Sequence, residues 1–534
     1  MQLFIDIYGF LSVTLRGLIL AAQALSLGGL AYLTLPGLAA DTGFVGRARR
    51  ALFYCAAALA LGEALSGLAL MTMLAGTLQL PLPQLLGAAA VRIDLVAAAL
   101  AAAAASVLRT QGSLRLAAAL TLALFAVEVG ATHAASRLDD SARLYVAELA
   151  HLAGAAAWIG GIPFLLLDLR QGAPEARRFI VARFSRIAMG AVALLLGGGI
   201  FMAIDYLGEP AALFGTSYGV MLMAKIALLL ALLLLGGMNF LTGRRLARDP
   251  ATSTLRLRRF AEVEIGVGLT VMFCAASLTS LPPARDLLSY RASLEEVVDR
   301  VTPRLPIRLD SPDHAALSTS QPSYVEADVA RAYAAGEVPA PPRNAEDIAW
   351  SEYNHHWAGL FVVAMGLMAL AERSPRLAPV ARHWPLVFLG LAAFVFLRGD
   401  ETVWPLGHLG LIESLRDPEI AQHRFFVLLI ILFGLFEWRV RLGRAQSAWA
   451  PYVFPLTVAI AAAFLLTHSH GLASPKEELL IEITHMPLAL VGVTVGWARW
   501  LDLRADGAVA RVAGYIWPTA LALAGLMLLF YREA

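Results

Sequence analysis

The stretch GVMLMAKIALLLALLLLGGMNFL, residues 219–241, decides the fold class of this chain. Lys225 is its single charged residue. An apolar run of about 20 residues is long enough to cross the hydrocarbon core of a bilayer as a helix. Similar runs recur along the whole chain of 534 residues. Because backbone polar groups in lipid must be satisfied within each segment, the sequence predicts an all-α, polytopic transmembrane helical bundle.

Composition supports this class. Hydrophobic residues make up 59% of the chain and charged residues only 15%, with a mean hydropathy of +0.68. Soluble globular domains do not have such a composition. The formal net charge is +2 and no basic stripe is present, so we expect contact with membrane lipid and none with nucleic acid. Cys55 and Cys274 lie inside apolar runs, where we expect buried small residues rather than a disulfide framework.

Fourteen apolar runs are predicted to span the membrane, in an eight-span and a six-span bundle. The predicted spans are 15–39, 51–76, 88–108, 115–134, 144–167, 186–206, 219–241, 260–281, 355–372, 384–398, 423–438, 452–470, 480–499 and 513–531. A long proline-rich hydrophilic connection separates the two bundles. The predicted parts are therefore residues 1–281, 282–354 and 355–534.

Arginine is distributed unequally between the two sets of alternating loops. One set carries it throughout, as in "RARR" at residues 47–50, and is predicted to be cytoplasmic by the positive-inside rule. The opposite set of short loops (77–87, 135–143, 207–218, 399–422 and 471–479) is predicted to be external, and its basic residues are Arg137, Arg143, Arg416 and Lys476. Both termini then lie on the outer face, and we expect the first apolar segment to be a retained anchor.

Most of the histidines lie on one predicted side of the membrane. Of the 11 histidines, only His383 falls on the predicted cytoplasmic side. In the second bundle, imidazoles from four predicted helices lie at one membrane depth, in a pattern that includes LLTHSHGLASPKEELLIEITHMP at 465–487. Neutral imidazole binds copper, zinc, iron and nickel. The predicted principal metal site consists of His355, His356, His423, His468, His470 and His485.

Three further residues are predicted to support this site. Glu478, Glu482 and His485 are spaced i, i+4 and i+7 and therefore share a helix face. Glu482 would orient the imidazole or bind the metal directly, and the thioether of Met486 would favour Cu(I). The alternative is that these histidines lie at headgroup depth only because imidazole is amphipathic.

The first bundle has a smaller predicted site. His133 and His151 would bind metal there, with help from Met71 or Met73. Ionisable groups inside a membrane are costly, so Glu63, Glu128 and Lys225 are interpreted as relay groups. The alternatives are that the methionines only pack and that the Glu–Lys pairs only hold helices together. The glycine steps SLGGL, WIGGI, LGGGI and LGGMN fit close helix packing.

No Walker A, GxSxG, HExxH or CxxCH motif occurs in the sequence, so we expect no enzymatic activity. Without an ATP-binding motif, transport would be passive or coupled to protons or to the membrane potential.

The chain resembles the copper resistance protein D (CopD) family in its long form, which has an additional C-terminal bundle. The marks are HLAGAAAWIGG from His151, with Trp158, Gly160 and Gly161, RFSR at 183–186, and TSYG at 216–219 followed by Ala224 and Lys225. SEYNHHWAGLF, AQHRFF, LLTHSH and EITHMPLAL resemble the C-terminal bundle of long members. The resemblance implies a bacterial inner-membrane protein that moves copper from periplasm to cytoplasm with a periplasmic copper-binding partner.

Two alternatives remain at this point. Histidines from different helices at one depth also suit bis-imidazole ligation in a b-type haem protein with an electron-transfer or reductase role. A copper chaperone or oxidase-assembly scaffold that does not transport would share the same ligands. The sequence leaves the direction of transfer, the copper oxidation state and the oligomeric state open.

Overall fold

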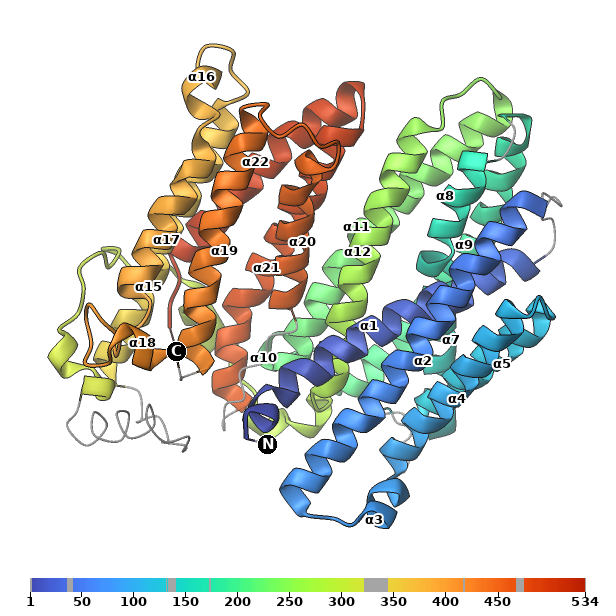
Figure 1. Ribbon diagram of the computed structural model, residues 1–534, viewed down its shortest axis with the longest axis horizontal. Coiled ribbons are helices and arrows are strands. Elements are labelled where there is room, and N and C mark those ends of the chain that lie inside the picture. Colours follow the sequence, from blue (N-terminus) through green and yellow to red (C-terminus); the bar gives the residue numbers. More distant parts are fainter. Residues whose placement is uncertain are drawn as a thin grey trace. The chain divides into compact units, whose positions relative to one another are not determined.

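A computed structural model describes residues 2–35, 42–130, 132, 141–171, 174–320, 344–415, 418–466 and 475–533. Helices account for the ordered elements in these ranges, and the β-pairing found in them is a single bridge between Val403 and Leu409. The prediction of an all-α chain is confirmed (Figure 1).

Every predicted span overlaps a helix within the described ranges, but the count of fourteen is not confirmed. In the described residues, 10 helices are long and apolar enough to cross a membrane. Helix α5 (Leu114–Val129) has 16 residues and α20 (Val453–Leu465) has 13, so each is shorter than a typical crossing. Helices α19 (Pro418–Arg441) and α21 (Pro475–Arg504) also lie outside the ten. The chain is nevertheless a multi-pass membrane protein.

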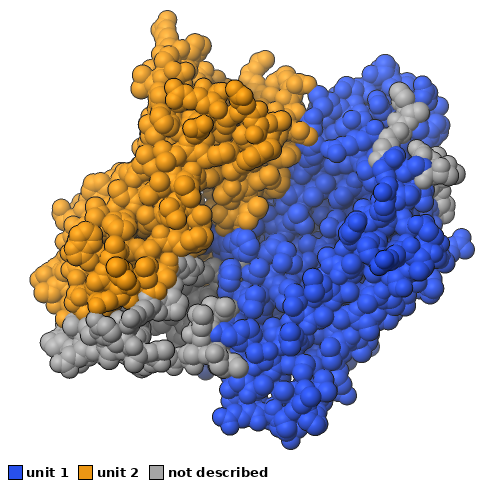
Figure 2. Space-filling view, viewed as in Figure 1, with its two compact units in different colours: residues 1–292, 463–479 blue, residues 293–462, 480–534 orange. Residues whose placement is uncertain are grey.

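The chain forms two compact units, coloured separately in Figure 2. Unit 1 comprises residues 1–292 and 463–479, and unit 2 comprises residues 293–462 and 480–534. The division after Ala292 lies within the predicted connection 282–354, whose described part contains α13 (Leu294–Val301) and several short helical turns. The three predicted parts stay a prediction.

Helix α1 lies at the centre of unit 1. It packs against α2, α5, α8, α12 and the π-helical turn η1 (Ala156–Gly160). The helices of unit 1 are α1 (Gln2–Thr34), α2 (Thr42–Leu78), α3 (Leu82–Gly87), α4 (Ala89–Arg109), α5, α7 (Ser141–Ala155), α8 (Ile162–Gln171), α9 (Arg177–Leu207), α10 (Ala212–Gly215), α11 (Ser217–Arg248) and α12 (Leu255–Ser280).

Glycine permits the closest approach in this unit. A Cβ added to Gly28 of α1 would lie 2.2 Å from the carbonyl oxygen of Ala156, and one added to Gly160 would lie 1.7 Å from that of Ala24. Neither position accepts a side chain without moving a helix backbone. The steps SLGGL and WIGGI therefore bring α1 and η1 into backbone contact, as expected for small residues in membrane helices.

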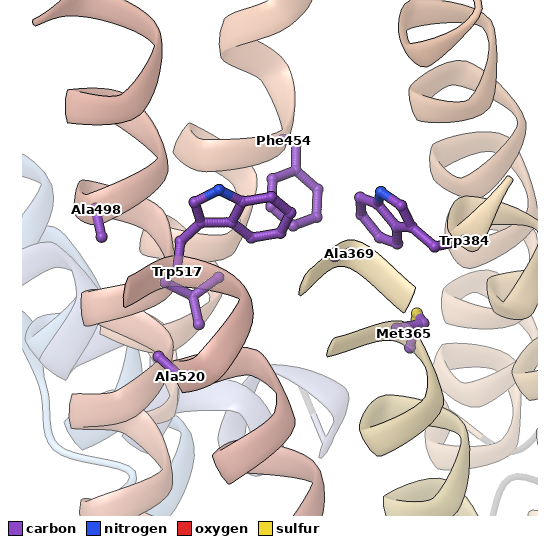
Figure 3. Packing of buried hydrophobic residues seen from close by; sticks show 8 residues of the cluster. Met365, Ala369, Trp384, Phe454, Ala498, Trp517 and Ala520 are labelled. Carbon is purple, nitrogen blue, oxygen red and sulfur yellow. The ribbon is translucent and has the colours of Figure 1, made fainter. Parts of the chain in front are cut away.

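Unit 2 is built around the pairing of α15 (Ala345–Ala371) with α22 (Gly507–Leu529). The other helices of this unit are α13, α16 (Ala378–Ala381), α17 (Val387–Arg398), α18 (Leu411–Ser414), α19, α20 and α21. Trp384, Phe454 and Trp517 face one another in its core (Figure 3), and their ring centroids are 5.3–6.0 Å apart. Arg441 lies over both indoles, 5.1 and 5.3 Å from their centroids, so a buried cation is stabilised by the aromatic faces.

Candidate metal centre

The predicted six-histidine site is only partly described. His468 and His470, the centre of the stretch 465–487, lie outside the described residues, as does His133. Within the part of the chain that is described, no three His, Cys, Asp or Glu side chains lie close enough to hold a metal ion. The complete ligand set therefore stays a prediction, and the surroundings of the described histidines decide what each can contribute.

His355 and His485 both lie against Tyr531, which follows the last helix. His355 on α15 stacks on the tyrosine ring at 3.9 Å between centroids, and His485 on α21 meets the same ring edge-on at 6.0 Å. The Nδ1–H group of His355 donates to the carbonyl of Ser351 at 2.8 Å. In a neutral imidazole with Nδ1 protonated, Nε2 carries the lone pair, which is the form that binds a metal.

The C-terminal segment is held in place beside these two imidazoles. The Tyr531 hydroxyl donates to Glu533 at 3.0 Å, and Ser351 donates to the same carboxylate. Arg532 pairs with Asp299 on α13 at 3.1 Å. Burial, followed by the Glu533 charge, raises the pKa of Tyr531, so this hydroxyl remains a donor. The sequence prediction missed Tyr531 and Glu533, because nothing in a terminal YRE tripeptide indicates where it packs.

Both ring nitrogens of His356 contact the backbone. Its Nδ1 lies 2.9 Å from the carbonyl oxygen of Arg308, and its Nε2 lies 2.9 Å from the carbonyl oxygen of Tyr531. Both ring nitrogens of His356 therefore face backbone carbonyl oxygens. In this arrangement His356 links Arg308 of the connection and Tyr531 of the C-terminal segment to α15, and its predicted metal-binding role stays a prediction.

His423 has a carboxylate partner. Its Nδ1 lies 2.6 Å from Oδ1 of Asp400, whose side chain is only 7% exposed, and Arg424 pairs with the same carboxylate at 3.5 Å. A carboxylate on one imidazole nitrogen fixes the orientation of the ring. This partner comes from the loop after α17 and was not predicted from the sequence.

The supporting residues of α21 are buried. Glu482 and Met486 are each 2% exposed, and both lie within one helical turn of His485. Glu478 lies in the first turns of α21, where its side chain is outside the described part. Whether Glu478, Glu482 and His485 act together on a metal, as their i, i+4, i+7 spacing predicts, stays a prediction.

In unit 1, His151 packs against a glycine step of α9. Its Nδ1 lies 2.8 Å from the carbonyl of Leu195, and a Cβ on Gly199 would lie only 2.8 Å from that nitrogen. Trp158, seven residues after His151, has different neighbours, since it lies against Gly236 of α11. The π-helical turn between them rotates the later residues by about 100° relative to a regular helix.

Glu148 and Lys225 lie near His151. Thr132 donates to Glu148 at 2.6 Å, so this carboxylate lies beside the residue that precedes His133. Lys225 of α11 faces Glu148, His151 and Cys274 within electrostatic range. The predicted helpers Met71 and Met73 on α2 are half-buried.

The structure brings two predicted relay residues together. The carboxyl groups of Glu63 on α2 and Glu128 on α5 hydrogen-bond to each other, and the Gln23 amide of α1 contacts both. Arg16 of α1 pairs with Glu128 at 2.8 Å. Gln23 is 2% exposed and was missed, because one glutamine in an apolar run indicates no particular partner.

Comparisons with known proteins match part of the chain. Residues 179–278 match the family model described as Copper resistance protein D. Copper transport protein CutJ of Bacillus subtilis (strain 168) is 35% identical over 136 residues, which are 25% of this chain. The match spans 24% of the length of that curated relative. No solved structure matches this chain.

Proposed function

Because residues 179–278 belong to the copper resistance protein D family, we propose that this chain moves copper from the periplasm toward the cytoplasm across a bacterial inner membrane. The family match carries the proposal, since it covers most of α9, α11 and α12, the helices that surround His151 and Lys225. The apolar helices supply the membrane location. Copper is the cargo in this proposal, and the chain acts without catalysing a reaction.

Capture takes place at the outer ends of the helices of unit 2. His355 offers Nε2 as a lone-pair donor beside His485, and the buried Met486 adds a soft ligand suited to Cu(I). His423, oriented by Asp400, and the pair His468 and His470 complete the proposed ligand set. The arginine asymmetry of the loops supports periplasmic termini and therefore a periplasmic capture site.

Transfer involves polar groups of unit 1. His151, with Glu148 and Lys225 nearby, is the proposed second copper site, and His133 follows Thr132, which already bonds Glu148. The Glu63–Glu128 pair, bridged by Gln23, is the proposed relay group for proton-coupled movement. A periplasmic copper-binding protein is the proposed donor, because the described part of the connection 282–354 offers His314 as its only imidazole.

The test is copper accumulation in sealed vesicles that contain the purified protein. We expect copper to enter the lumen over time and the double variant His468→Ala/His470→Ala to lose most copper binding while it retains its helical content. His383→Ala is the matched control, because this imidazole accepts a bond from Trp438 on the predicted cytoplasmic side. Bound copper without accumulation would identify a scaffold or chaperone, and a Soret band without copper would identify a haem protein.

A further inference from the structure

A cavity of about 340 Å³ lies within unit 1 between helices α8, α9, α11 and α12. Its volume is at the lower end of the range of about 300–1,000 Å³ that small-molecule pockets occupy. Phe184 of α9 and Phe240 of α11 contribute aromatic walls. Met189 and Phe240, which also line it, are 53% and 38% exposed on helices that cross the membrane. The mouth therefore opens to hydrocarbon, and a ligand must enter from the lipid.

One end of this apolar cavity is polar. Glu264 of α12 is 3% exposed, and it accepts hydrogen bonds from the Asn239 amide nitrogen and the Trp158 indole. The Asn239 amide nitrogen donates to Glu264, so Nδ2 of this side chain lies toward the carboxyl group. The other amide atom, Oδ1 of Asn239, is buried and has no hydrogen-bond partner. A buried acceptor of this kind requires a donor.

The backbone keeps this end of the cavity open. A Cβ on Gly236 would lie 3.2 Å from Cζ2 of Trp158 and 3.7 Å from Oε2 of Glu264, so any side chain there would fill the polar end. The π-helical turn Ala156–Gly160 carries Trp158 to this position. Such turns are frequent at functional sites.

We propose that this cavity binds an isoprenoid quinol, the reduced and hydroxyl-bearing form of a membrane quinone. The quinol hydroxyl donates to Oδ1 of Asn239, the ring lies among Trp158, Phe184 and Phe240, and the isoprenoid tail leaves through the mouth into lipid. The corresponding quinone has only carbonyl acceptors and cannot satisfy Asn239. The site therefore selects the reduced form, and this binding is independent of the proposed movement of copper.

The test uses full-length protein in phosphatidylcholine nanodiscs. Decylubiquinol, kept reduced under anaerobic conditions, and decylubiquinone are each titrated, and both the melting temperature and the amount retained after repurification are measured. We expect about one quinol per protein and a rise in melting temperature. The quinone should bind about tenfold more weakly, the effect of leaving one buried acceptor unpaired.

Two variants and one control test whether the quinol binds in this cavity. Asn239→Leu should remove the preference for quinol over quinone, and Gly236→Ala should reduce quinol retention. Gly190→Ala on α9 is the matched control, because its Cβ meets nothing within 4 Å and it does not line the cavity. Equal retention of quinol and quinone that persists in Asn239→Leu would overturn the proposal and indicate simple partition into lipid. Displacement of quinol by equimolar dioleoylglycerol would assign the site to a hydroxyl-bearing lipid instead.

Discussion

The imidazole of His355 lies against the phenol ring of Tyr531, with ring centroids 3.9 Å apart and 23° between the ring planes. The backbone carbonyl of the same tyrosine accepts a hydrogen bond from His356 at 2.9 Å. Tyr531 thus gives two adjacent histidines different surroundings. One ring nitrogen of His355 faces a backbone carbonyl, whereas both ring nitrogens of His356 do.

Replacement of these two histidines should therefore have different consequences. His355→Ala should lower the copper bound per protein and change the melting temperature little. His356→Ala leaves two carbonyls without a donor and should cost roughly 2 kcal/mol of stability. Copper analysis and thermal unfolding of the purified variants measure both effects. Loss of copper in His356→Ala at unchanged stability would show that His356 is a ligand after all.

The two carboxylates of the Glu63–Glu128 pair should also be unequal. Glu128 pairs directly with Arg16, so Glu128→Gln leaves a cation without its anion inside the bundle and should cost roughly 3 kcal/mol. Glu63→Gln retains a hydrogen-bonding amide beside Gln23 and should cost under about 1 kcal/mol. Denaturant unfolding in detergent compares the two isosteric variants. Equal losses would mean that Arg16 does not depend on Glu128.

The glycine step of α9 offers a matched pair. A Cβ on Gly198 would lie 2.2 Å from the carbonyl oxygen of Ala147, whereas one on Gly197 meets nothing within 4 Å. Gly198→Ala must push α7, which carries His151, away from α9 and should cost about 1–3 kcal/mol. Gly197→Ala should be neutral or stabilising by up to about 1 kcal/mol. Melting temperatures that fall equally in both variants would contradict this packing.

Acidification should loosen the connection around His314. This imidazole packs edge-on against Trp350 at 4.6 Å and accepts a bond from Arg398 at 3.4 Å. Burial, followed by the charge of Arg398, lowers the pKa of His314 below its usual 6.5. The His314 imidazole therefore binds a proton more readily in the unfolded segment than in the folded one. The folded segment is fully stabilised above about pH 6.5, and its stability falls as the pH drops below that value.

Hydrogen exchange of the segment 314–320 at pH 7.5 and pH 5 measures this effect. We expect faster exchange at pH 5 in the native chain. The His314→Gln variant, which does not titrate, should exchange at similar rates at both pH values once the intrinsic pH dependence is corrected. A difference that persists in His314→Gln would place the titrating group elsewhere.

The helices themselves were predictable because their signal is local. Each apolar run, such as 219–241, satisfies its backbone hydrogen bonds within one segment. Length and hydropathy therefore predict a helix whatever its neighbours in the fold are. The number of crossings was less predictable. Helix α5 ends at Val129, which makes it shorter than the predicted span 115–134, because hydropathy does not show where a helix stops.

The sequence by itself determined an all-α membrane chain and the segments where its imidazoles and intramembrane carboxylates lie. Only the tertiary structure decided their partners: Glu63 with Glu128, His423 with Asp400, and Tyr531 against His355. The reason is physical. A hydrogen bond or a ring contact joins residues that are distant in the chain. Helix periodicity shows on which face of its helix a residue lies, but it does not show which other helix packs against that face. Asn239 and Glu264 meet for the same reason, through the packing of α11 against α12.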